Sequence, residues 1–144
     1  MQKGTLLIAN TLIGLFINLL KIKKMRVISS KTHGVLDYIY GILLIAAPWL
    51  FEFDRGGPET WVPVVSGIVV ILMALMTDYE LSAAKVIPLN THLWIDGILG
   101  AFLLLSPWIF GFSNFIYWPH VIFGIIALGS ALMTEPRTSG IRVT

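Results

Sequence analysis

Long stretches without a charged side chain dominate this chain. Residues 60–77 contain no Asp, Glu, Lys or Arg, and neither do residues 97–134. A helix that crosses the hydrocarbon core of a bilayer needs about 20 mostly apolar residues. The second stretch is therefore long enough for two helices, with Gly111–Asn114 as the break between them. The pattern predicts four membrane-spanning helices, over residues 33–51, 61–77, 92–110 and 117–134.

The composition supports this interpretation and excludes other classes of protein. Of the 144 residues, 56% are hydrophobic and only 12% are charged, whereas an average soluble domain is about 25% charged. So few charges cannot cover the surface of a soluble domain of this size, and they also exclude a disordered chain. The absence of cysteine excludes disulfides and thiolate metal sites. We expect an all-α, multi-pass membrane helical bundle.

An internal repeat organises the four helices. Nine residues of the first helix region recur 59 positions later, and seven of the second helix region recur 57 positions later. The first set is Thr32, His33, Asp37, Gly41, Leu44, Pro48, Trp49, Phe51 and Phe53, and the second is Trp61, Gly67, Ile68, Ala74, Leu75, Met76 and Thr77. Residues 32–80 and 91–135 are thus two tandem two-helix hairpins, which we expect to be related by a pseudo-two-fold axis along the membrane normal.

The basic residues predict how the bundle is oriented. Eight of them fall on the side that contains the ends of the two repeats and the 78–91 loop, whereas the opposite side has Arg55 and, if the N-terminal segment also spans, Lys3. Lys and Arg accumulate in cytoplasmic loops, so we expect a cell (inner) membrane protein with that side in the cytoplasm. The five aromatic residues expected at the outer ends of the helices are Trp49, Trp61, Trp108, Tyr117 and Trp118. No nucleic-acid motif accompanies the basic cluster.

The N-terminal segment, residues 1–31, combines an apolar stretch with a basic one. Residues 4–20 are uncharged but span only about 25 Å as a helix, short of a hydrocarbon core of about 30 Å. Residues 1–24 form either a fifth helix or surface-lying anchor, or Met25 is the real start. Both interpretations stay open.

Two tripeptides near the outer ends of the first and third helices carry a family resemblance. Ala47-Pro48-Trp49 and Ser106-Pro107-Trp108 occupy matching places in the two repeats, and they resemble the motif of the SPW-repeat family of small integral membrane proteins. The resemblance covers roughly residues 32–135, leaves the first 24 residues outside, and implies paired two-helix repeats in a membrane. It implies no activity. Since Ala47 replaces the serine, a required hydroxyl in both halves is not expected.

The main candidate for chemistry is a pair of His-x-x-x-Asp elements, His33 with Asp37 and His92 with Asp96. This spacing puts both side chains on one helix face, and imidazole with carboxylate suits Zn²⁺ or another divalent ion. The same groups can instead relay protons. Asp78 and Glu135, at the inner ends of the second and fourth helices, are possible contributors.

A structural role is the favoured explanation of these pairs. In that case Thr32 and Thr91 cap the helices, and each Asp accepts hydrogen bonds from its own His and from a neighbouring helix. Pro48 and Pro107 either kink their helices or end them, and we favour helix ends. His120 has no counterpart in the first repeat and is expected to be interfacial.

The function expected from the sequence is a non-enzymatic structural or interaction role, with no catalytic residue. No phosphate-binding loop, haem motif or nucleotide fingerprint is present, so no cofactor is expected. The expected partners are the lipid bilayer and either a second copy or another membrane protein. The first alternative is a small transporter or proton- or ion-conducting protein that uses the His-Asp stripe. A membrane-embedded metal-dependent enzyme is the third hypothesis.

Overall fold

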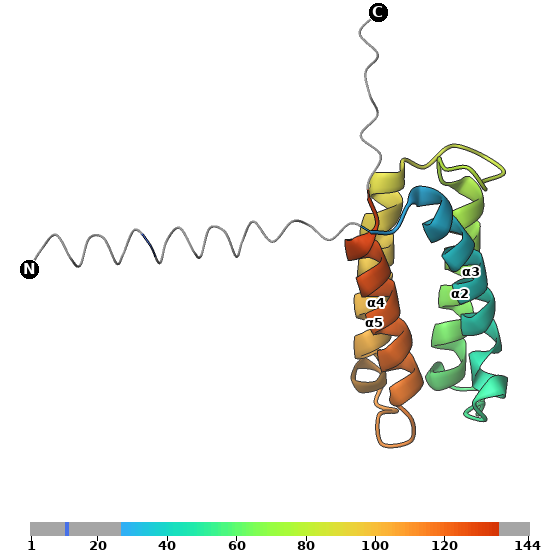
Figure 1. Cartoon of the computed structure of the whole chain (residues 1–144). Coiled ribbons are helices and arrows are strands. Elements are labelled where there is room, and N and C mark those ends of the chain that lie inside the picture. Colours follow the sequence, from blue (N-terminus) through green and yellow to red (C-terminus); the bar gives the residue numbers. More distant parts are fainter. Residues whose placement is uncertain (1–10, 12–26, 136–144) are drawn as a thin grey trace, which may run out of the picture.

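The computed structural model describes residues 27–135 and Thr11. Four helices make up the bundle: α2 (Ser30–Leu50), α3 (Pro58–Met76), α4 (Leu89–Ile109) and α5 (Trp118–Met133). They form two antiparallel hairpins that stand side by side, α2 with α3 and α4 with α5 (Figure 1). The all-α fold predicted from the sequence is confirmed. The predictions for residues 1–24 lie outside the described part of the chain.

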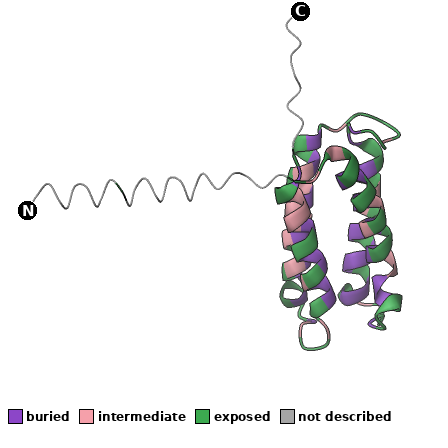
Figure 2. Cartoon of the chain, viewed as in Figure 1, coloured by how far each residue is buried: buried purple, intermediate pink, exposed green. Residues whose placement is uncertain are grey.

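Three of the helices are long and apolar enough to cross a membrane, namely α2, α3 and α4. α5 is equally apolar in character but has 16 residues, or about 24 Å at 1.5 Å per residue. Exposed residues line the outer faces of the helices (Figure 2), and they include large apolar side chains such as Ile42, Ile98 and Leu132. A bundle that presents aliphatic side chains outward is suited to lipid, so this chain is a membrane protein.

Three helices begin three residues earlier than the sequence pattern predicts. α2 begins after Ser29, whose side chain accepts a hydrogen bond from the backbone N–H of Thr32. Proline residues lie at the starts of α3 and α4, as Pro58 in the first turn and Pro88 as the N-cap. The expectation that Thr32 and Thr91 cap their helices is therefore wrong, because both lie inside the first turn.

Close glycine contacts hold each hairpin together. A Cβ on Gly67 would lie 2.5 Å from the carbonyl oxygen of Gly41, and a Cβ on Gly124 would lie 2.7 Å from that of Gly100. Without these side chains the paired helix backbones come into contact, as small residues allow in membrane bundles. The two hairpins thus use equivalent positions. Residues 41 and 100 are separated by the repeat offset of 59, and residues 67 and 124 are separated by the offset of 57.

The hairpins are joined crosswise at the end of the bundle that contains residues 27–29, 77–88 and 134–135, which we call the terminal end. There Ile28 pairs with Thr134, and Ile87 pairs with Thr77. The backbone N–H of Ile28 donates to Met133, and that of Ile87 donates to Met76. The same pattern therefore occurs twice, with the repeat offsets of 59 and 57, which agrees with a pseudo-two-fold arrangement.

The opposite end, residues 51–57 and 110–117, is the loop end. Pro48 and Pro107 lie two residues before the last residues of α2 and α4. Their carbonyls accept hydrogen bonds from the turns that follow, Pro48 from Asp54 and Pro107 from Ser113. Both prolines are buried, whereas the adjacent Trp49 and Trp108 are 55% and 56% exposed. The tripeptide motif thus ends a helix and places a tryptophan on the outer surface.

Candidate functional site

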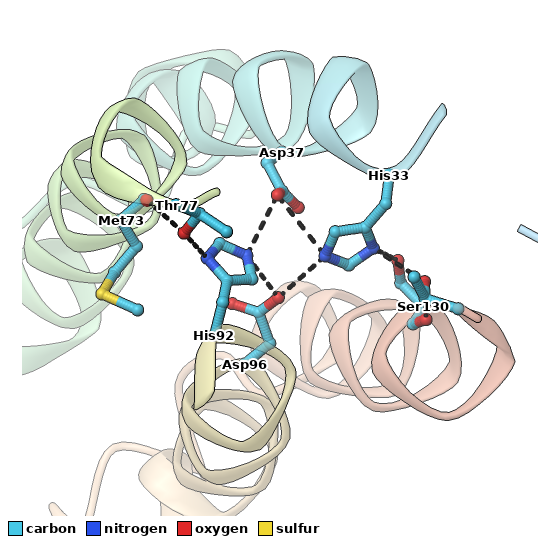
Figure 3. A network of polar contacts seen from close by, with 8 residues as sticks. His33, Asp37, Met73, Thr77, His92, Asp96 and Ser130 are labelled. Carbon is cyan, nitrogen blue, oxygen red and sulfur yellow. Dashed lines mark hydrogen bonds and ion pairs between the residues drawn. The ribbon is translucent and has the colours of Figure 1, made fainter. Parts of the chain in front are cut away.

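The two His-Asp pairs converge inside the bundle near its terminal end (Figure 3). α2 carries His33 and Asp37, and α4 carries His92 and Asp96, so both elements of the repeat contribute equally. His33 Nε2 lies 3.4 Å from Asp37 Oδ2 and 3.1 Å from Asp96 Oδ2. His92 Nε2 lies 3.1 and 3.0 Å from the same two oxygens. We call these four residues the His–Asp cluster.

The spacing of the polar residues along the two helices explains why the cluster is buried. Both His and both Asp lie on the faces of α2 and α4 that point into the bundle, with Gly41 and Leu44 continuing the face of α2. Both histidines are 0% exposed and both aspartates 6% exposed. Side chains of this polarity are stable at membrane depth only where they face one another instead of lipid.

Threonines from the opposite hairpin fix the outer nitrogen of each imidazole. Thr77 Oγ1 lies 2.7 Å from His92 Nδ1, and Thr134 Oγ1 lies 2.9 Å from His33 Nδ1. Each threonine hydroxyl donates its own proton to the carbonyl four residues earlier, Met73 or Ser130. Its oxygen is thus left to accept, so Nδ1 of each histidine is the donor. This tautomer directs Nε2 of both rings at the carboxylates.

Sequence reasoning missed Thr77, Thr134 and Ser130, whose Oγ lies 3.1 Å from His33 Nδ1. A signal was present, because Thr77 and Thr134 recur at the repeat offset and are polar residues at the ends of apolar helices. Their role as partners of the histidines depends on the crosswise joining of the hairpins, which the repeat alone does not specify.

The proposed contributors Asp78 and Glu135 do not belong to the cluster. Asp78 lies on the surface and forms a long ion pair with Lys85, at 3.9 Å. Glu135 is exposed, and its backbone N–H donates to Ile28. Both residues follow the last residue of their helix by two positions, where the chain has already turned away from the bundle interior.

One face of the cluster borders a crevice of about 190 Å³ between the hairpins, lined by Asp37 and Asp96. Tyr40 and Ser130 are the other polar residues of its wall, and the rest of the wall is apolar. Tyr79 packs against the cluster with its ring edge-on to His92 at 6.2 Å and against Gly34, where a Cβ would lie 2.5 Å from the tyrosine ring. Burial raises the pKa of Tyr79, which keeps this phenol neutral.

His120 is not interfacial as the sequence suggested. It is 1% exposed, with Phe53 and Phe112 at ring-centroid distances of 5.5 and 4.9 Å. Its Nε2 lies 3.1 Å from the carbonyl of Glu59. The two phenylalanines are repeat equivalents and are themselves buried, so this histidine packs in the interior at the loop end.

Chemically, the cluster can hold positive charge. Two carboxylates and two imidazoles are brought together, and their ligand atoms all lie within 4.8 Å of one another. Such a group either shares protons or coordinates a cation. The tripeptide residues Pro48, Trp49, Ser106, Pro107 and Trp108 lie near the loop end and take no part in it.

These features define a membrane protein built from two equivalent hairpins. The family model of the SPW repeat domain matches residues 3–77 and 31–134, and the chain belongs to this family. The first match begins at residue 3, so it covers N-terminal residues that the resemblance based on the tripeptides left outside. Comparison with curated proteins and with solved structures found no match.

Proposed function

We propose that this chain is a non-enzymatic membrane protein whose two hairpins are joined into one unit by the His–Asp cluster. The observation that carries this proposal is the crosswise support of the cluster. Each histidine contacts the aspartates of both hairpins and is held at Nδ1 by a threonine of the other hairpin. Neither hairpin provides these contacts alone, and a buried polar group without partners is costly in a membrane.

The size of the crevice supports a non-enzymatic role. About 190 Å³ lies beside the carboxylates, whereas ligand sites have volumes of about 300–1,000 Å³. Larger hollows of about 500 and 440 Å³ lie on the lipid-facing surface, and no titratable side chain lines them. None of the four cluster residues lines either of the larger hollows.

The charge distribution supports an inner-membrane location with the terminal end in the cytoplasm. Lys31 and Lys85 lie at that end, whereas Arg55 lies at the loop end. Because the chain has no cysteine, single cysteines introduced at Ala84 and Asn114 can report the two sides. We expect a membrane-impermeant maleimide added to intact cells to label Asn114→Cys and not Ala84→Cys. The reverse labelling would overturn this orientation.

The lipid bilayer and a second copy of the chain are the proposed partners. Four helices form a thin bundle, and many large apolar side chains are exposed on their outward faces. We expect a dimer in lipid nanodiscs by single-molecule photobleaching. Single bleaching steps only, at every lipid-to-protein ratio, would contradict this proposal.

Joining of the hairpins is tested by the distance between them. Spin labels on Glu52→Cys and Asn114→Cys place one probe on each hairpin loop. We expect one narrow distance distribution in the parent and a broad one with Asp37→Asn plus Asp96→Asn. Asp78→Asn is the matched control, since this aspartate lies outside the cluster. An unchanged distribution in the double variant would contradict the proposal.

Proton or ion conduction is a second candidate function, and the carboxylates in the crevice wall favour it. Flux in proteoliposomes separates the two. A conducting protein would show proton or cation flux that disappears with Asp37→Asn plus Asp96→Asn. The structural role predicts no flux above protein-free liposomes in the folded parent.

A further inference from the structure

We propose that the His–Asp cluster binds one divalent transition-metal ion of the zinc type. The ligands are Nε2 of His33 and His92 and one carboxylate oxygen each of Asp37 and Asp96. This inference goes beyond the proposed function, because the cluster can join the hairpins through shared protons without any metal.

The distances in the cluster suit a tetrahedral ion. Bonds of about 2.0–2.1 Å to nitrogen and oxygen place the ligand atoms of a tetrahedron about 3.3–3.4 Å apart by simple geometry. The four nitrogen–oxygen distances are 3.0, 3.1, 3.1 and 3.4 Å. The two remaining pairs, nitrogen with nitrogen and oxygen with oxygen, lie within 4.8 Å of each other, so these like atoms must approach one another for the four ligands to close around an ion.

Two atoms of the cluster lack a hydrogen-bond partner although they are fully enclosed. They are Asp37 Oδ2 and His92 Nε2. His92 Nε2 lies almost equally far from two carboxylate oxygens, at 3.1 and 3.0 Å, but has hydrogen-bond geometry to neither. A nitrogen directed between two oxygens is oriented as a ligand to an ion that lies among all three.

The threonines supply the outer contacts that metal-binding histidines normally have. A ligating imidazole usually donates its other N–H to an oxygen, which fixes the tautomer and the ring orientation. Thr77 and Thr134 do this for His92 and His33. Because Nδ1 keeps its proton, Nε2 of each ring is the nitrogen that can coordinate, in place of any proton that it shares with a carboxylate.

Charge and ligand type select the class of ion. Two carboxylates neutralise one divalent cation, and a neutral site is favoured where burial penalises net charge. Nitrogen ligands suit zinc, cobalt and related metals, whereas Ca²⁺ takes six to eight oxygen ligands and Mg²⁺ prefers octahedral oxygen. Four ligands, two of them nitrogen, thus favour the zinc type.

The test measures metal bound to the full-length chain purified without a polyhistidine tag. After removal of metal with a chelator, the protein is dialysed against micromolar Zn²⁺ or Co²⁺ and analysed by mass spectrometry for metal and protein. We expect about one ion per chain, and a visible Co²⁺ spectrum of tetrahedral intensity. Mg²⁺ at the same concentration is expected not to bind.

Variants locate the ion. Asp37→Asn plus Asp96→Asn is expected to reduce bound metal at least tenfold, whereas Asp78→Asn plus Glu135→Gln, with the same loss of charge outside the cluster, retains it. Circular dichroism establishes that the variants are folded. Should the first variant not fold, Thr77→Val provides a milder test, because it keeps all four ligands and is expected to shift the Co²⁺ spectrum.

Less than 0.1 ion per folded parent chain, or equal binding by the folded Asp37→Asn plus Asp96→Asn variant, would overturn the metal site. The spin-label experiment gives an independent result. A cluster-dependent hairpin distance without bound metal would leave the proposed function standing and reject this inference. Bound metal, together with a hairpin distance that does not change in the Asp37→Asn plus Asp96→Asn variant, would support this inference and reject the proposed function.

Discussion

The two ends of the bundle treat histidine in opposite ways. At the terminal end His33 and His92 are repeat equivalents, and each has an anchored Nδ1 and an Nε2 directed at carboxylates. At the loop end His120 is alone, with Nε2 near a backbone carbonyl and a buried Nδ1 that has no hydrogen-bond partner. Pro63 occupies the matching position of the first repeat.

This difference separates a symmetric polar site from a position at which the two repeats diverge. The terminal end keeps equivalent residues because each hairpin completes the polar site of the other. The loop end has only to end two helices and cover the core, so a histidine and a proline are both acceptable there. Mutational effects should therefore be symmetric at the cluster and asymmetric at His120, although the prolines, tryptophans and phenylalanines of the loop end do recur in both repeats.

The largest effect is expected at the cluster. Asp37→Asn and Asp96→Asn should each cost about 3–5 kcal/mol, because loss of one partner leaves the remaining buried charges without compensation. Equal costs are expected from the symmetric contacts. SDS-induced unfolding in mixed micelles measures both, with Asp78→Asn as a control that changes the midpoint little. Losses of unfolding free energy that differ by more than about twofold between the two variants would show that the two aspartates are not equivalent.

The next largest effect concerns the packing of each hairpin. Gly67→Ala and Gly124→Ala should each cost about 1–3 kcal/mol, since the new Cβ would meet a backbone carbonyl at 2.5 or 2.7 Å. Gly97→Ala is the matched control, because nothing lies within 4 Å of its added Cβ. The control should be neutral or slightly stabilising. The same unfolding assay applies, and a destabilised control would point to a general effect of alanine.

Within the terminal end one difference between the repeats is expected to be measurable. Thr77→Val should cost about 1–3 kcal/mol, because it leaves the buried Nδ1 donor of His92 unpaired. Thr134→Val should cost less, since Ser130 Oγ still lies 3.1 Å from His33 Nδ1. Adding Ser130→Ala to Thr134→Val should restore the full cost. A smaller cost for Thr77→Val than for Thr134→Val would contradict this account.

The smallest effect is expected at the loop end. The guanidinium of Arg55 lies 3.3 Å from the centre of the Phe115 ring and links the two loops. Arg55→Ala should cost about 0.5–1 kcal/mol, the range of a cation–π contact at an exposed site. Arg55→Lys should recover part of it. A cost as large as that of the aspartate variants would show that the loop end also joins the hairpins.

Most of the helical architecture could be predicted from the sequence. The length of the charge-free stretches and the i, i+4 spacing of the repeated His-Asp pairs both follow from helix geometry. The i, i+4 spacing of the two His-Asp pairs allowed His33 and His92 to converge but did not require it. The anchoring by Thr77 and Thr134 could not be predicted, since it depends on which hairpin end meets which helix. The helix starts were also missed, because Ser29 and not Thr32 forms the cap.

The crosswise joining at the terminal end leaves the bundle independent of which hairpin precedes the other along the chain. Ile28 meets Thr134 as Ile87 meets Thr77, so residue 135 lies beside residue 27 in the way that residue 78 lies beside residue 86. A circular permutant that links 135 to 27 and opens the chain within 80–85 is expected to form the same bundle.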